Sequence, residues 1–167
     1  MTQDLIHGDE TTVQVLKEDG REASDKPYMW AYRSGEQSAE PIVMLDYQPG
    51  RGQIHPQTFL GSYSGLLMTD GYSAWRSLQG ATHLGCMAHA RRRFVEAQKT
   101  RGRNGGLPDQ ALQVFQRLYK VEAQARQLPL RPGESRADCI PRLRQQHSLP
   151  VLTAFKDWLK SGLTTNR

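Results

Sequence analysis

The stretch that decides the fold is Leu66–Phe94, which reads LLMTDGYSAWRSLQGATHLGCMAHARRRF. Three apolar residues of strand character lead into Asp70, and a short helical piece then leads to a second strand-like run, Thr82–Gly85. A Cys-x-x-His segment and a basic helix follow. A strand that ends on Asp-Gly places a carboxylate at the edge of a sheet, where backbone and ligand come close. We predict that Asp70 belongs to a metal-binding acidic cluster and that its partner is Asp9.

Three further strands are predicted upstream of this stretch. Residues Thr11–Leu16 alternate in the manner of a β-branched strand, and Asp9 and Glu10 lie at or just inside its start. Tyr28–Arg33 and Pro41–Tyr47 are the second and third strands. Short polar loops join them, which predicts an antiparallel meander.

The order of elements predicts the fold class. With helices at His55–Leu60 and Tyr72–Leu78, the chain runs as three strands, a helix, a strand, a helix, a strand and a helix. This is the order of a ribonuclease H-like α/β fold, in which a mixed five-stranded sheet has three antiparallel strands followed by two parallel ones. The first and fourth strands are neighbours in such a sheet, so Asp9 and Asp70 should converge. We assign this core to residues 1–98.

The last third of the chain, residues 99–167, is predicted to be a helical insertion. One apolar stripe runs along Asp109–Leu128 at spacings of three and four residues. Its members are Ala111, Val114, Leu118, Val121, Ala125 and Leu128. A polar helix over Glu134–Gln146 should be kinked by Pro141. Ser148 should cap a final helix, whose inward residues are predicted to be Val151, Leu152, Phe155, Trp158 and Leu159.

Composition favours an anionic partner in a reducing compartment. The 167-residue chain carries a net charge of +5 and has a pI near 9.4, which suggests nucleic acid first. Two cysteines are too few for a disulfide framework, so we expect a cytoplasmic protein. No apolar signal core or run of roughly 20 apolar residues is present, which predicts no membrane association.

The candidate chemistry rests on oxygen ligands and arginines. Asp9 and Asp70 could hold Mg²⁺ or Mn²⁺, as hard cations prefer carboxylates, or could be ordinary strand-end acids. The basic patch near them could bind DNA phosphates or be a solvated helix face. Its members are Arg91, Arg92, Arg93, Arg101 and Arg103. Cys86 and His89 could form half a zinc site, but a buried thiol beside a histidine is the preferred interpretation, because His83 and Cys139 complete a site poorly.

Five motifs, in order, resemble the catalytic core of insertion sequence 66 family transposases. They are HGDETTVQVL, YMWAYRSG, LDYQPGRG, LMTDGYSAW and GCMAHARRRFVEA. The resemblance implies a DDE transposase in which two Asp and one Glu bind Mg²⁺ and drive DNA strand cleavage and transfer. It implies that Asp9 is the first acid and Asp70 the second. It also implies DNA partners (transposon ends and target), and Cys86 and His89 match a C-x-x-H feature of several DDE groups.

The sequence departs from this pattern at the third acid. The family's Glu lies in an Asn-Asn-x-x-Glu segment after the helical insertion, and these residues contain no such segment. We therefore expect a truncated core that is inactive alone, with Glu96 as a better internal substitute than Glu122. One alternative is another ribonuclease H-like nuclease. The other is a non-catalytic DNA-binding remnant that associates with itself or with full-length transposase.

Overall fold

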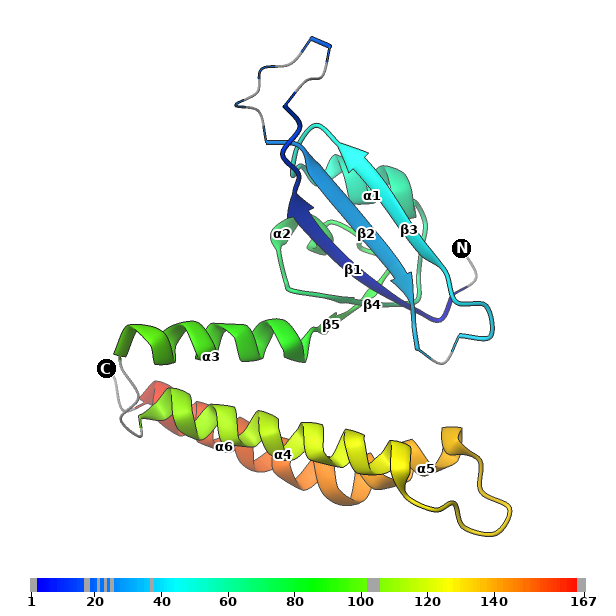
Figure 1. The fold of residues 1–167 in the computed structure, drawn as a ribbon, viewed down its shortest axis with the longest axis vertical. Coiled ribbons are helices and arrows are strands. Elements are labelled where there is room, and N and C mark those ends of the chain that lie inside the picture. Colours follow the sequence, from blue (N-terminus) through cyan, green and yellow to red (C-terminus); the bar gives the residue numbers. More distant parts are fainter. Residues whose placement is uncertain are drawn as a thin grey trace. The chain divides into compact units, whose positions relative to one another are not determined.

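The computed structural model describes residues 3–16, 19–20, 22, 24, 26–36, 38–101 and 106–164. The chain divides into two compact units, Met1–Ala90 and Arg91–Arg167. The first unit contains a β-sheet with two short helices, and the second is helical (Figure 1).

The first unit is built on a five-stranded mixed sheet in the order β3-β2-β1-β4-β5. Its strands are β1 (Leu5–Thr12), β2 (Tyr28–Ser34), β3 (Val43–Gln48), β4 (Leu66–Thr69) and β5 (Thr82–Gly85). The β1–β2 and β2–β3 pairs are antiparallel, whereas β1–β4 and β4–β5 are parallel. The predicted meander, the two parallel strands and the β1–β4 adjacency are therefore confirmed.

The predicted position of the first strand is wrong. Strand β1 is Leu5–Thr12, so Asp9 and Glu10 lie in its second half and not at its start. Thr12 pairs with Tyr28, the first residue of β2. Among the described residues, the alternating segment that continues to Leu16 has no paired strand beyond this point. Ile6 and His7 pair with β2 on one side and with β4 on the other, and this pairing fixes the strand. It is a tertiary effect that overrides local propensity.

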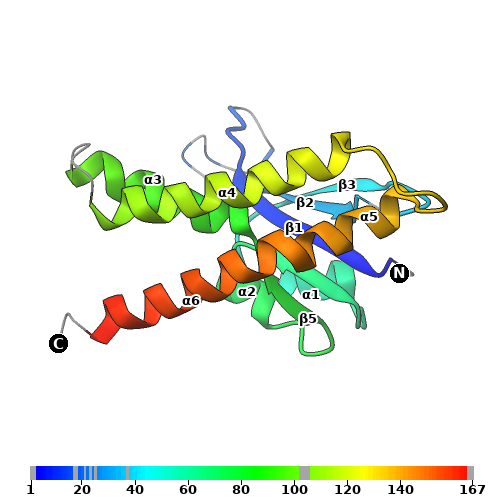
Figure 2. The same ribbon diagram turned by 90° about the horizontal axis from the view of Figure 1, so that it is seen from below.

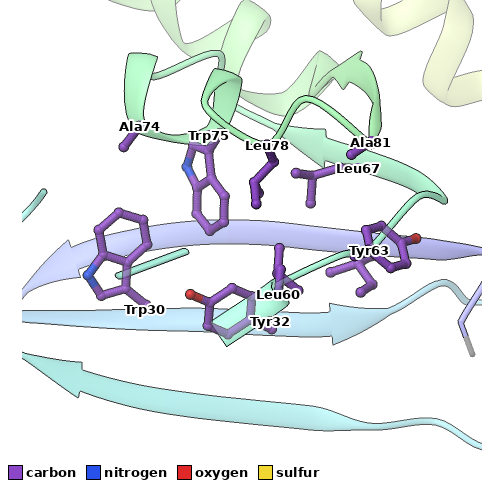
Figure 3. Packing of buried hydrophobic residues seen from close by; sticks show 10 residues of the cluster. Trp30, Tyr32, Leu60, Tyr63, Leu67, Ala74, Trp75, Leu78 and Ala81 are labelled. Carbon is purple, nitrogen blue, oxygen red and sulfur yellow. The ribbon is translucent and has the colours of Figure 1, made fainter. Parts of the chain in front are cut away.

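The core of the first unit lies between the sheet and helices α1 (Ile54–Leu60) and α2 (Ser73–Arg76). Trp30 and Tyr32 lie on one face of β2, and Trp75 points from α2 onto them (Figure 3). The Trp30 and Trp75 rings meet edge to face at 5.0 Å, and Phe59 stacks on Tyr32 at 4.0 Å. Aromatic packing of this kind adds to the stabilisation from buried area.

A glycine makes room for this packing. Gly8 is buried on β1, and a Cβ built there would lie 2.7 Å from Cη2 of Trp75. Ordinary carbon–carbon contacts are about 3.5–4.0 Å, so the indole can cover β1 only where no side chain is present. This close approach explains a glycine in the middle of a strand.

The second unit consists of helices. Its elements are the end of α3 (Met87–Arg101), α4 (Leu107–Gln127), α5 (Arg136–Leu143), the π-helical segment η1 (Arg144–Ser148) and α6 (Leu149–Thr164). Figure 2 shows α5, η1 and α6 as one continuous rod, and α4 contacts all three. Among the described residues, no helix is both long and apolar enough to cross a membrane.

Two details of this unit correct the predictions. Pro141 lies inside α5. Ser148 caps no helix, because the chain continues without a break through η1 into α6. The buried hydroxyl of Ser148 has no partner in the described part of the chain. On α4, Phe115 is buried and Leu128 is exposed. Phe115 packs with Phe155 of α6, whereas Leu128 follows the last helical residue.

The inward face of α6 is narrower than predicted. Val151 and Phe155 are buried and Trp158 is half-buried, but Leu152 and Leu159 are exposed. The inward residues of α6 are therefore Val151, Phe155 and Trp158. Their spacings of four and three residues place them along one narrow face of the helix.

Candidate functional site

The two predicted acids lie at one edge of the sheet. Parallel β1 and β4 pair each residue with the one 61 positions later, from Leu5 with Leu66 to His7 with Met68. The same offset, continued two residues further, joins Asp9 to Asp70. Asp70 follows directly after the last residue of β4. The carboxyl ends of parallel strands are where open α/β sheets bind ligands.

The carboxylates of these acids differ in their surroundings. The Asp9 side chain is 57% exposed, and its Oδ1 accepts a hydrogen bond of 3.0 Å from the amide of Glu10. Asp70 is half-buried, and its Oδ1 accepts a bond of 2.8 Å from the amide of Tyr72. Within the described residues, the second oxygen of each carboxylate accepts no backbone hydrogen bond. Such an oxygen is the kind that a hard cation takes as a ligand.

The neighbouring acid, Glu10, is committed to the protein interior. It alternates with Asp9 along β1 and therefore faces the opposite side of the sheet. Its side chain is 1% exposed and accepts a hydrogen bond from Nε1 of Trp75 at 2.7 Å. Arg51 donates to the other oxygen through Nε at 2.8 Å and also through its terminal nitrogen. Burial of a carboxylate requires such charge-assisted bonds.

The pKa of Glu10 is raised above its ordinary value. Burial is the main cause, and the charge of Asp70 adds to it, while the hydrogen bonds from Arg51 and Trp75 act in the opposite direction. Loss of water around the carboxylate thus outweighs the compensation from its two donors. Glu10 and Asp70 are therefore close enough for their charges to interact.

His89 and Cys86 lie next to the two acids at this edge of the sheet. The Nε2 of His89 lies 3.6 Å from Oδ2 of Asp9, and its buried Nδ1 has no partner in the described part of the chain. Cys86 has a half-buried free thiol, and its backbone amide donates to the carbonyl of Thr69 at 2.8 Å. Across the described residues, no group of three or more metal-ligating His, Cys, Asp or Glu side chains is present.

The two residues considered as zinc completions have other surroundings. His83 contacts the carbonyl of Leu78 through Nε2 at 3.1 Å. Cys139 is fully buried in an apolar cluster of the helical unit, between α4 and α5. The preferred interpretation, a buried thiol beside a helix-start histidine, stays a prediction, and Cys86 is half-buried and not fully buried.

The predicted DNA-binding arginines lie mainly on α3. Arg92 and Arg93 are exposed and Arg91 is half-buried. Arg101 ends α3, but its side chain lies outside the described part of the chain, and Arg103 lies outside the described residues altogether. Exposed guanidinium groups on one helix are suited to phosphate contact.

The two candidate substitutes for a third acid also differ. Glu96 is exposed on α3, the helix that follows β5. Glu122 accepts two hydrogen bonds from Arg144, at 2.8 and 2.7 Å. This pairing lowers the pKa of Glu122 and occupies both its oxygens.

Comparison with known proteins identifies the family of this chain. The matching family model is described as "Transposase IS66 family" and covers residues 1–166. The chain therefore belongs to the IS66 family of transposases, and the family resemblance is confirmed.

Similar proteins occur in Sinorhizobium fredii. The uncharacterized protein y4jD is 29% identical over 170 residues, covering 93% of this chain and 31% of that protein. The uncharacterized protein y4qI is 28% identical, with 93% and 30% covered. The chain thus spans about a third of the length of these relatives. No solved structure matches the chain.

Proposed function

We propose that this chain is part of the catalytic core of a DDE transposase with a ribonuclease H-like fold, and that Asp9 and Asp70 are two of its acids. The observation that carries the proposal is the β1–β4 register, whose offset of 61 residues also separates the two aspartates. Membership of the transposase family supports it. The strand order β3-β2-β1-β4-β5 is the order expected of a ribonuclease H-like sheet.

The donor set suits Mg²⁺ or Mn²⁺. Asp9 offers an exposed carboxylate and Asp70 an oxygen that Tyr72 does not occupy, and both are hard ligands. A divalent cation would supply charge stabilisation for phosphoryl transfer and lower the pKa of an attacking water or hydroxyl. Asp9 and Asp70 would hold it, and Glu10 would not, because its carboxylate is buried against Arg51 and Trp75.

DNA is the proposed partner. Exposed Arg92 and Arg93 on α3 and the net charge of +5 favour contact with a phosphate backbone. Such contacts hold DNA without reading its sequence. These arginines would therefore hold the DNA, and the two aspartates would serve the chemistry.

Strand cleavage of supercoiled DNA in Mn²⁺ tests this proposal. Two chains are compared: the 167 residues alone and the same chain continued through the Asn-Asn-x-x-Glu segment of a longer family member. We expect nicking only from the extended chain, and loss of nicking in its Asp9→Asn and Asp70→Asn variants. Asp46→Asn, which changes a half-buried acid on β3, is the matched control and should retain activity.

Two results would overturn the assignment. One is cleavage by the extended chain that survives Asp9→Asn or Asp70→Asn. The other is cleavage by the 167 residues alone that disappears in both Asp70→Asn and Glu96→Gln, because it would make Glu96 the third acid.

A further inference from the structure

The contacts around Arg51 connect Asp70 to Glu10, the residue that follows Asp9 on β1. The backbone ladder between β1 and β4 ends at His7 and Met68, two residues before each aspartate. The ladder brings the two aspartates to the same edge of the sheet, but it does not extend to the aspartates themselves. Other contacts must hold the Asp70 turn against the end of β1.

The first link joins Arg51 to β1. Glu10, the residue after Asp9, accepts from Arg51 Nε at 2.8 Å, and its carboxylate is almost completely shielded from water. Trp75 holds the second oxygen at 2.7 Å. Because both oxygens are occupied, the Glu10 carboxylate provides a rigid anchor for the guanidinium group.

The second link joins Arg51 to the Asp70 turn. Its guanidinium carbon lies 3.7 Å from the centre of the Tyr72 ring, which is stacking distance. The Tyr72 hydroxyl donates to the backbone carbonyl of Arg51 at 2.9 Å. The amide of the same tyrosine donates to Oδ1 of Asp70 at 2.8 Å. A continuous path of contacts therefore runs from Glu10 through Arg51 and Tyr72 to Asp70.

We propose that Arg51 is a positioning residue that sets the Asp70 carboxylate against Asp9, a role that rests on the proposed function. The planar guanidinium binds Glu10 with its edge and Tyr72 with its face, and lysine can do neither in the same way. The loop that carries it is held in place by Trp30, whose Nε1 donates to the carbonyl of Gly50 at 3.3 Å. Arg51 acts through Tyr72 and touches neither a metal nor DNA in this role.

Two measurements on the full chain test this role. The first is hydrogen exchange of the Tyr72 amide, the donor to Asp70. The second is Mn²⁺ affinity, measured from the electron paramagnetic resonance signal of the free ion. We expect Arg51→Lys to speed exchange of this amide at least tenfold and to weaken Mn²⁺ binding about 10- to 100-fold, as for other residues that orient metal ligands. Tyr72→Phe, which keeps the ring and removes the hydroxyl, should have a smaller effect on both.

The matched control is Arg142→Lys. Arg142 forms a comparable pair with Glu134 in the helical unit, through Nε at 2.6 Å. This variant should change neither measurement, although it also breaks a two-point arginine–glutamate contact. A loss of Mn²⁺ binding in Arg142→Lys equal to that in Arg51→Lys would attribute the effect to stability and overturn the proposal.

The remaining outcomes separate this inference from the proposed function. Unchanged exchange of the Tyr72 amide in Arg51→Lys overturns the positioning role, whether or not Mn²⁺ binds. Faster exchange with Mn²⁺ affinity within twofold of the parent overturns it as well. If the parent chain binds no Mn²⁺, or binds it equally in Asp9→Asn, the proposed metal site fails, and the amide exchange alone decides whether Arg51 holds the turn.

Discussion

Replacing Gly8 by alanine should destabilise the first unit by forcing Trp75 away from β1. The new Cβ would lie 2.7 Å from Cη2 and 2.8 Å from Cζ3 of an indole that is completely buried. The ring cannot move freely, because its Nε1 is bound to Glu10 at 2.7 Å. Overpacking of this kind costs about 1–3 kcal/mol.

A second glycine provides the reference. Gly85 in β5 has nothing within 4 Å of its ideal Cβ. Alanine there should be neutral or stabilise by about 0.4–1 kcal/mol, because it restricts the unfolded chain. The same gain applies at Gly8, so the difference between the two variants isolates the clash. We expect Gly8→Ala to be less stable than Gly85→Ala by about 1–3 kcal/mol.

Urea unfolding followed by tryptophan fluorescence measures this difference. A Trp158→Phe background leaves Trp30 and Trp75, both in the first unit, as the emitting residues. The indole N–H resonance of Trp75 should also shift in Gly8→Ala, because the ring leaves Glu10. Equal unfolding free energies, within about 0.5 kcal/mol, together with an unmoved indole signal, would refute the argument that Gly8 is needed for this contact.

Two further predictions concern charge. Changing Arg91, Arg92 and Arg93 to alanine should weaken DNA binding. The slope of log binding constant against log salt concentration should become shallower by about 0.9 for each lost phosphate contact. An unchanged slope in filter binding would show that these arginines form only a solvated surface. The pKa of Glu134 is lowered to about 2, chiefly by its hydrogen bond from Arg142, from an ordinary value of 4.5. The ionised Glu134 therefore stabilises the fold above pH 4.5, and this stabilisation is lost as the pH falls through about 2. Between pH 5 and pH 2.5 the melting temperature of Glu134→Gln should fall less than that of the parent chain. Equal falls would contradict the pairing.

The arrangement of the sheet could be predicted because it depends on local signals. Two of the strands could be recognised, one from the alternating residues in Tyr28–Arg33 and one from the Asp-Gly at its end. The order of the strands along the chain then predicted that β1 and β4 are neighbours. The position of β1 could not be predicted from alternation, because Gly8 carries no apolar side chain. Its burial depends on Trp75, which lies 67 positions away in the chain and contacts it only in the folded unit.

The part of the site that sequence missed is the contact between Glu10 and Arg51. They are 41 positions apart, and no spacing rule connects a strand acid with a loop arginine. Two signals did exist: Glu10 alternates with Asp9 and so faces the opposite side of β1, and Arg51 lies between two glycines. Neither identifies its partner without the fold.

The helical unit shows a similar limit. Periodicity predicted Val114 in the buried stripe, yet Phe115 is the fully buried residue, at 1% exposure. Both positions fit a spacing of three or four from neighbouring members of the stripe. Packing against Phe155 favours the larger ring, and this choice depends on a helix that begins more than thirty residues later.

The central claim, that Asp9 and Asp70 share one divalent cation, is tested most directly by paramagnetic broadening with Mn²⁺. The amide signals of Glu10 and Gly71, which flank the two acids, should broaden together at the same low Mn²⁺ concentration. Both effects should disappear in Asp9→Asn and in Asp70→Asn, and persist in Asp46→Asn. Broadening of one signal that survives removal of the other aspartate would contradict a shared site.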